Sequence, residues 1–306
     1  MQKVGVVGLG RMGKVHLRNY SEMPDVEIMG VMDADESALK EAAGRFGVPV
    51  FTDLDALLAR GLDAVSVCVP TVLHHAVGLK VIESGAGLLI EKPLAATTAE
   101  GRELVEAARR KGVALMVGHV ERFNPAVRRV KELLGDDVIS VQIERAGPYP
   151  ARIQDVGVIR DLGPHDIDLV RFLTGAEFRQ VYGVRATSRG QHEDNVLISA
   201  QMDNGVLANI SANWATPFRS RSIRVACRSK FVAADLVNQV VHEYGPFSPE
   251  SQSYTVREWP LVAREPIKEE LTCFLRCLRE KTPVPISGAD GLAVLEVIDR
   301  IFACGA

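Results

Sequence analysis

The sequence predicts two domains, an α/β domain with a parallel sheet over residues 1–120 and an α+β domain with an open, mostly antiparallel sheet over residues 121–306. In the first part, short apolar runs alternate with helical patterns, as in strand-helix-strand units. After Gly118, strand-like segments follow one another with few helices between them, and Asp203-Asn204-Gly205 is a hairpin signal between two of these segments. A length of 306 residues also suits about two domains.

Composition indicates an ordinary globular protein, with 47% hydrophobic residues, 25% charged residues and a net charge of -3. Because there is no basic excess, we expect neither a nucleic acid nor an anionic membrane as a partner. The five cysteines show no C-x-x-C spacing, so neither a disulfide framework nor a metal site is predicted. The first strand signal begins by Lys3, which leaves no room for a signal peptide, and we expect a cytoplasmic protein.

A glycine-rich loop follows the first predicted strand, Val4–Val7, and precedes a helical pattern. Its spacing, G-x-G-x-x-G, allows a tight turn, a close approach of the backbone to a pyrophosphate, and contact between helix and strand. A second predicted strand ends at Asp33, where a carboxylate would accept a hydrogen bond from a ribose 2′-hydroxyl and repel a 2′-phosphate. The pattern predicts a Rossmann dinucleotide-binding domain that prefers NAD to NADP. The loop residues expected to hold the cofactor are Gly8, Leu9, Gly10, Arg11, Met12 and Gly13.

Two further loops follow predicted parallel strands. The apolar run Leu88–Ile90 leads directly into Glu91-Lys92-Pro93, and Pro93 ends the strand and keeps Lys92 extended. Because ligands of open α/β sheets bind outside the carboxyl edge, Glu91 and Lys92 are candidates for contact with the cofactor. A surface turn with two solvated charges is the alternative. Pro70, Thr71 and His74 follow another strand and are placed beside the nicotinamide, although His74 could equally be structural.

A second group of polar residues, Asp161-Leu162-Gly163-Pro164-His165-Asp166-Ile167-Asp168, begins a predicted helix. Pro164 suits the first helical turn, and His165 and Asp168 are three residues apart and share a face. Imidazole beside a carboxylate can take a proton from an alcohol near neutral pH. The alternative is that the aspartates cap the helix while His165 is a core residue.

The chain resembles the Gfo/Idh/MocA oxidoreductases, on the glycine loop, the E-K-P motif and the D-x-G-x-H-x-x-D motif. The resemblance implies that Lys92 lies by the nicotinamide and the substrate, that His165 is the general base, and that Asp161 is its partner. It also implies a cis bond between Lys92 and Pro93.

A closer resemblance, over residues 117–127 and 147–158, is to the branch of this family that oxidises C3 of UDP-N-acetylglucosamine. It implies a nucleotide-sugar substrate, with Lys92, Asp161 and His165 among the substrate-binding residues. Arg122, Asn124 and Arg152 complete the predicted substrate site. Arginine forks such as those of Arg122, Arg145, Arg152 and Arg160 suit a diphosphate, although any one of them could be a solvated surface charge.

Two other functions remain open, an NAD-dependent dehydrogenase of a free polyol such as inositol, and a regulator that senses the cofactor without turnover. The predicted helices after Gly118 are too few to cover both faces of a wide sheet. We therefore expect a homodimer or homotetramer built through the open sheet face, as the resemblance also implies. The alternative is that the polar segment Tyr244 to Pro260 folds over that face within one chain.

Overall fold

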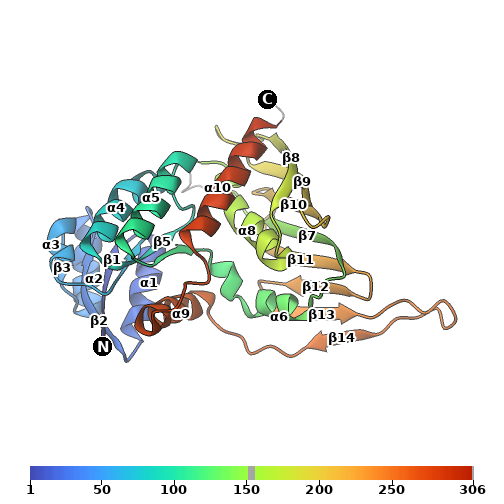
Figure 1. The fold of residues 1–306 in the computed structure, drawn as a ribbon, viewed down its shortest axis with the longest axis horizontal. Helices are drawn as coiled ribbons and strands as arrows, with labels where there is room; N and C mark the ends of the chain where they lie inside the picture. Colours follow the sequence, from blue (N-terminus) through green and yellow to red (C-terminus); the bar gives the residue numbers. More distant parts are fainter. Residues whose placement is uncertain (151–155, 305–306) are drawn as a thin grey trace. The chain divides into compact units, whose positions relative to one another are not determined.

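The structure is a computed structural model that describes residues 1–150 and 156–304. It divides into two compact units (Figure 1). The first unit contains Met1–His119 and Ile267–Leu295, and the second contains Val120–Pro266 and the chain from Glu296 onward. None of the described helices combines the length and the apolar character that crossing a membrane requires.

A six-stranded sheet forms the centre of the first unit, in the order β3-β2-β1-β4-β5-β6. All of its strand pairs are parallel, as predicted. The chain order reverses between β1 and β4, and sheets of this kind bind ligands at the carboxyl edge beside that point. The strands are β1 (Gln2–Val7), β2 (Val26–Met32), β3 (Val50–Phe51), β4 (Ala64–Val67), β5 (Gly87–Glu91) and β6 (Leu115–Gly118).

Helices connect these strands and cover the sheet, and α4 and α5 lie side by side (Figure 1). The start of α5 shows why a helix begins there. The Thr97 hydroxyl accepts a hydrogen bond from the Glu100 backbone, and the Glu100 carboxylate accepts one from the Thr97 backbone. The helix ends at Gly112, which adopts a left-handed conformation with φ of 71°. The helices are α1 (Arg11–Ser21), α2 (Glu36–Phe46), α3 (Leu54–Leu58), α4 (His74–Ser84) and α5 (Thr98–Lys111).

The chain returns to the first unit near its end, through α9 (Pro266–Glu280) and the first half of α10 (Gly288–Ala303). Leu278 packs over Gly87 so closely that a Cβ on this glycine would lie 2.7 Å from a Leu278 methyl carbon. Ser287 forms a bridge with Met116 in β6. This return is not contained in the predicted domain ranges of 1–120 and 121–306, because contacts so distant in sequence leave no local pattern.

An eight-stranded sheet forms the second unit, in the order β14-β13-β12-β11-β7-β10-β9-β8. Its pairs are antiparallel except for β7 with β10, which agrees with the predicted mostly antiparallel sheet. The strands are β7 (Val138–Ala146), β8 (Phe178–Ala186), β9 (Asn195–Met202), β10 (Leu207–Asn213), β11 (Ser220–Cys227), β12 (Phe231–Asp235), β13 (Val240–Tyr244) and β14 (Val256–Trp259).

Among the described residues, helices cover one face of this sheet and no helix covers the other, which is called the open face below. The covering helices are α6 (Pro125–Leu133), α7 (Val158–Asp161), α8 (Gly163–Thr174) and the end of α10, and Figure 1 shows α6, α8 and α10 on the same side of the sheet. Side chains alternate accordingly, since Val196 and Ile198 in β9 are buried while Leu197 between them is 55% exposed. On the open face, Val184 lies opposite Leu197 in the register of β8 and β9 and is 56% exposed.

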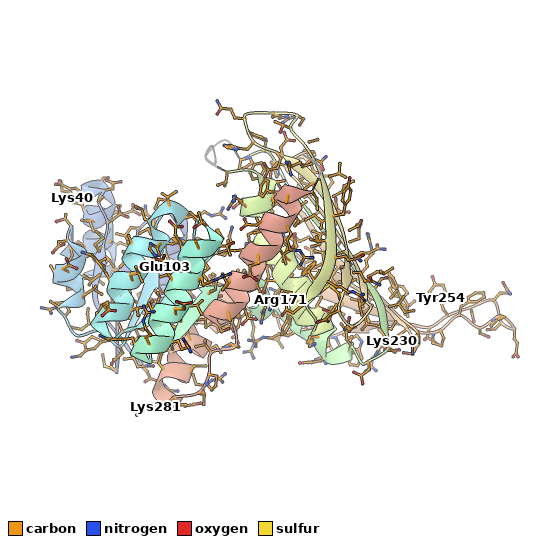
Figure 2. The ribbon with its side chains drawn as sticks, turned by 45° about the horizontal axis from the view of Figure 1, so that its top comes forward. Lys40, Glu103, Arg171, Lys230, Tyr254 and Lys281 are labelled. Carbon is orange, nitrogen blue, oxygen red and sulfur yellow. The ribbon has the colours of Figure 1, made fainter. Side chains whose placement is uncertain are left out.

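The sequence prediction missed β14 and the short helix α7, among other short elements. The segment Tyr244 to Pro260, to which no secondary structure was assigned, contains β14, which pairs with β13. The β13–β14 hairpin extends beyond the other strands, and Tyr254, labelled in Figure 2, is 58% exposed on it. The short helix α7 also precedes α8, so that Asp161 ends a helix instead of lying before one.

Candidate active site

The glycine loop lies at the carboxyl edge of β1, where the chain enters α1. Gly8 has a φ of +90°, and a Cβ on it would lie 2.7 Å from the Cys68 backbone after β4. A Cβ on Gly13 would overlap the carbonyl oxygen of Gly8, so this position packs the helix on the loop. Gly10, by contrast, has no atom within 4 Å of where its Cβ would be. The backbone is therefore open at the position where a pyrophosphate would approach the start of α1.

Asp33 follows β2 and lies against the glycine loop. Its carboxylate accepts hydrogen bonds from the backbone N–H groups of Leu9, at 2.5 Å, and Asp35, at 2.8 Å. The predicted loop residues and Asp33 are thus together at one edge of the sheet. An open glycine backbone beside a fixed carboxylate fits the pyrophosphate and the ribose of a dinucleotide.

Glu91 ends β5 and is buried, and Lys92 after it is half-buried. The Glu91 carboxylate lies 3.1 Å from His16 Nε2, which is fully buried on α1, and 3.3 Å from the Lys92 backbone nitrogen. Burial alone would raise the pKa of Glu91, but the His16 hydrogen bond and nearby positive charge hold that pKa below its ordinary value. The Lys92–Pro93 bond is cis, as the resemblance implies. Glu91 is therefore an internal anion that fixes the chain next to Lys92.

His74 begins α4 and connects two of the loops at this edge. Its Nδ1 lies 2.8 Å from the Pro93 carbonyl and its Nε2 lies 3.0 Å from the Val69 carbonyl. Burial lowers the pKa of His74, and the two carbonyl acceptors oppose this shift. His74 therefore holds the loop after β4, with Pro70 and Thr71, against the loop that carries Lys92.

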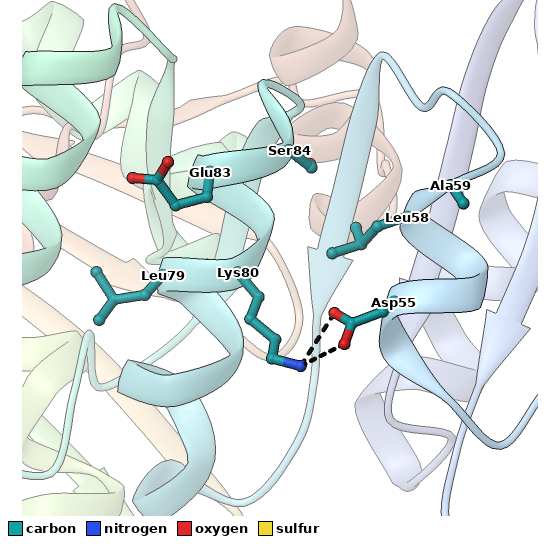
Figure 3. A pocket seen from close by; sticks show the side chains of 7 residues that line it. All are labelled: Asp55, Leu58, Ala59, Leu79, Lys80, Glu83 and Ser84. Carbon is teal, nitrogen blue, oxygen red and sulfur yellow. Dashed lines mark hydrogen bonds and ion pairs between the residues drawn. The ribbon is translucent and has the colours of Figure 1, made fainter.

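A groove between α3 and α4 is a poor candidate for the site (Figure 3). Lys80 and Asp55 form an exposed ion pair across it, at 2.8 Å. Its α4 residues run from Leu79 to Ser84, at the end of the helix that leads into β5. This end of α4 lies at the amino edge of the sheet, opposite to the glycine loop.

In the second unit, His165 lies in the first turn of α8 and is half-buried, as is Asp161 at the end of α7. Pro164 occupies the first turn, where its missing N–H costs no hydrogen bond. The His165 backbone nitrogen donates to the Leu162 carbonyl, at 3.2 Å, which joins the two helices. The predicted base and its predicted partner thus lie on consecutive helices of one unit.

Two sets of charges hold the start of α8. In the first, Arg122 donates from Nε and Nη2 to the two carboxylate oxygens of Asp168, at 2.8 and 2.6 Å. In the second, the fully buried Arg145 of β7 donates to Glu121, at 2.9 Å, and to Asp166, at 2.8 Å. Glu121 and Arg122 are neighbours in the 3-10 turn η2 (Val120–Phe123), so one turn and one strand fix the helix that carries His165.

The charges in this network are strongly coupled. Burial would raise the pKa of Glu121, but Arg145 and then Arg221 hold it below its ordinary value of 4.5. Burial raises the pKa of Asp166 to about 6, because loss of water outweighs the attraction of Arg145. Arg221 of β11 also donates to Glu121, at 2.8 Å. The sequence prediction gave no site role to Arg221, Glu121 or Asp166, because their partners lie on other elements, 21 to 100 positions away along the chain.

Several of the residues predicted to bind substrate instead contact other parts of the protein. Arg122 is committed to Asp168, and Asn124 caps α6 through the Ala126 nitrogen and donates to Leu236, at 3.0 and 3.1 Å. These contacts favour structural roles for both residues. Arg160 lies 4.0 Å from Asp299. Arg152 lies outside the described residues.

We expect the substitution Glu121→Gln to lower the free energy of unfolding by about 3 kcal/mol at pH 7, because it leaves Arg145 buried with only one carboxylate. A carboxyl group with a depressed pKa stabilises the fold above its unfolded value and loses this effect as pH falls through the folded value. The difference between variant and wild type should therefore shrink as pH falls from the ordinary value of 4.5 through the lower folded value. Denaturant unfolding at several pH values measures this difference in the free energy of unfolding.

Glu132→Gln serves as the control for this experiment, since Glu132 pairs with Arg129 on the exposed surface of α6. Its effect should stay within about 0.5 kcal/mol. A Glu121→Gln protein as stable as this control at pH 7 would contradict the role given to the buried network.

Comparisons with known proteins agree with this geometry. The model of an oxidoreductase family with an NAD-binding Rossmann fold matches residues 2–119, and that of the GFO/IDH/MocA C-terminal domain matches residues 129–231. The UDP-N-acetylglucosamine 3-dehydrogenase of Acidithiobacillus ferrooxidans is 30% identical over 299 residues, which cover 96% of this chain and 94% of that protein. An inositol 2-dehydrogenase of Rhizobium meliloti is 28% identical, over 97% of this chain and 94% of that protein.

Solved structures give the same result. A structure of the Acidithiobacillus ferrooxidans enzyme, GnnA, superimposes with a TM-score of 0.92 at 29% identity, over 98% of this chain and 96% of that one. GenD2 from gentamicin A biosynthesis, in complex with NAD, superimposes with a TM-score of 0.85 at 28% identity, over 99% of this chain and 93% of that one. The chain therefore belongs to the Gfo/Idh/MocA oxidoreductases, and it is an NAD-dependent dehydrogenase that acts on a CH–OH group.

Proposed function

We propose that this dehydrogenase oxidises the C3 hydroxyl of UDP-N-acetylglucosamine or a closely related UDP-N-acetylhexosamine. The observation that carries the proposal is the end-to-end similarity to the UDP-N-acetylglucosamine 3-dehydrogenase of Acidithiobacillus ferrooxidans, at 30% identity over 96% of the chain. The positions that the family resemblance assigns to catalysis are all present, as Lys92, Asp161 and His165.

In this proposal the first unit holds NAD through the glycine loop, Asp33, Pro70 and Thr71, and Lys92 lies beside the nicotinamide. Bound NAD supplies the hydride acceptor. Gly10 leaves the backbone open to the pyrophosphate, and Asp33 accepts the hydrogen bond of a ribose hydroxyl. His74 and Glu91 act through the backbone, since their contacts fix the segment that carries Lys92.

The proton chemistry is assigned to three side chains. His165 takes the proton of the substrate hydroxyl at one ring nitrogen, and Asp161 orients the imidazole. Lys92 donates a hydrogen bond to the same substrate oxygen and stabilises the negative charge that develops on it. Half-burial suits His165 for this task, because a base must be accessible to substrate while its helix stays fixed.

A dehydrogenase of a free polyol is the second candidate, supported by the 28% identity to an inositol 2-dehydrogenase over nearly the whole chain. Incubation with NAD and either UDP-N-acetylglucosamine or inositol, followed by absorbance of the reduced cofactor, separates the two. We expect reduction with the nucleotide-sugar. Reduction with inositol alone would replace the proposal, and no reduction across a broad panel of both classes would favour a cofactor-sensing regulator.

We expect Lys92→Ala and His165→Ala each to lower kcat by about 10²- to 10⁴-fold, the usual contribution of a general acid or base. Binding of NAD should be retained in both variants, as measured by titration calorimetry. His75→Ala is the control, because His75 is paired with Glu103 on the first unit at 2.8 Å. Near-normal turnover in either active-site variant would remove that residue from the mechanism.

We also propose that the protein forms a homodimer or homotetramer through the open face of the eight-stranded sheet. Val184 and Leu197 lie opposite each other there and are more than half exposed, and covering them requires a partner. A stable interface should bury more than about 1,000 Å².

Sedimentation equilibrium checks this assembly, with an expected mass of at least twice the 33.3 kDa of one chain. The substitution Leu197→Arg should shift the protein toward the monomer, whereas Val262→Arg, at a residue 74% exposed outside the sheet, should not. A monomeric wild type at micromolar concentration would overturn the proposal.

A further inference from the structure

Two arginines lie directly opposite each other on antiparallel strands, Arg145 on β7 and Arg221 on β11. The register also places Ala212 opposite Arg145, and Ala212 is fully buried, so this row is on the helix-covered face. Like charges at opposed positions destabilise an antiparallel pair. Such a local conflict is a feature that functional sites retain.

Arg145 has a complete structural explanation. Its side chain is 2% exposed and lies between the carboxylates of Glu121 and Asp166. It connects β7, η2 and α8, and removing it would leave two buried acids without their cation. The fold therefore requires Arg145. It gives no comparable reason for Arg221, which binds the same Glu121 carboxylate.

Arg221 is in a different situation. It donates from Nη1 to the Glu121 oxygen that already accepts from Arg145, and its side chain is 38% exposed. A guanidinium has five N–H donors in a planar fork, so within the described part of the chain this bond leaves most of its donors for other partners. The Arg221 cation is partly buried and lies opposite a second cation, and burial and then the charge of Arg145 lower its pKa against the opposing charges of Glu121 and Asp166. Both conditions strengthen the attraction for an incoming anion.

The location of Arg221 connects it to the proposed chemistry. Glu121 joins it to Arg145, and Arg145 binds Asp166, the residue next to His165 at the start of α8. Glu121 also restricts the guanidinium to one orientation, which lowers the entropy lost when a ligand binds. A planar fork suits the oxygens of a diphosphate better than an ammonium group does.

We propose that Arg221 binds the diphosphate of the nucleotide-sugar substrate and thereby selects nucleotide-linked sugars over free ones. This inference rests on the proposed function, because a free polyol carries no anion for Arg221 to bind. Glu121 positions Arg221, and Arg145 provides the rigid support for both. Arg219, two residues before Arg221, adds positive charge in the same region.

The test compares UDP with uridine, which lacks the phosphates, as ligands of the full chain in calorimetric titrations. In Arg221→Gln we expect the Kd for UDP to rise by about 10- to 100-fold, the value of a hydrogen bond to a charged group, with uridine affinity unchanged. The KM for UDP-N-acetylglucosamine should rise by a similar factor while kcat changes little. A role confined to supporting Glu121 would instead lower stability and kcat without distinguishing UDP from uridine.

Arg228→Gln is the matched control, since Arg228 is exposed just after β11 and its loss changes the net charge equally. Its UDP affinity should equal that of wild type. An equal loss of UDP affinity in both variants would show that only the net charge matters, and would overturn the proposal. If Arg221→Gln does not fold, Arg221→Lys is tested instead, because lysine keeps the positive charge but lacks the planar fork. An Arg221→Lys protein with unchanged UDP affinity would overturn the proposal.

The outcomes also separate this inference from the proposed function. If the wild type and Arg221→Gln bind UDP with equal affinity, the nucleotide-sugar function stands and only the role of Arg221 is removed. A wild type that binds no UDP removes both.

Discussion

The fully buried guanidinium of Arg145 is the constraint on which the second unit depends. Removing a cation from water costs several kcal/mol unless carboxylates at short distance compensate for it. The two carboxylates come from different segments, Glu121 from η2 and Asp166 from α8, at 2.9 and 2.8 Å. The ion pairs therefore form only when η2, β7 and α8 are in their native places. Arg122 adds a second connection between η2 and α8 through Asp168, so the turn that carries His165 is held on both sides.

The first unit is organised by a different constraint, which is the reversal of strand order between β1 and β4. It leaves room above the carboxyl edge for the glycine loop, and the lack of side chains at Gly8 and Gly13 allows the loop to lie against β4 and α1. His74 joins the loops after β4 and β5, and His16 on α1 contacts the Glu91 carboxylate. Residues that bind a cofactor are thereby supported by buried polar residues that do not need to touch it.

The sequence predicted positions best where the signal is a local spacing of residues. The glycine loop, Asp33 and the E-K-P segment each lie within a few residues of a strand end, and the structure places them at the carboxyl edge. The sequence was least informative about which charged side chains pair with one another. Arg122 was predicted as a substrate ligand, but its partner Asp168 is 46 positions away, and only the fold brings the two together. Arg221 was absent from the prediction for the same reason, since its contact with Glu121 spans 100 positions. Likewise β14 is a short edge strand whose pairing with β13 leaves little apolar pattern in Val256–Trp259.

The claim that unifies these features is that the chain removes hydrogen from C3 of a UDP-N-acetylhexosamine. UDP-N-acetylglucosamine with deuterium at C3 tests it most directly, by mass spectrometry of the reduced cofactor after a single turnover. The account predicts that the deuterium appears on the nicotinamide ring and that the sugar loses it. Reduced cofactor without deuterium would show that another carbon is oxidised, and deuterium retained on the sugar with no reduced cofactor would show that this nucleotide-sugar is not the substrate.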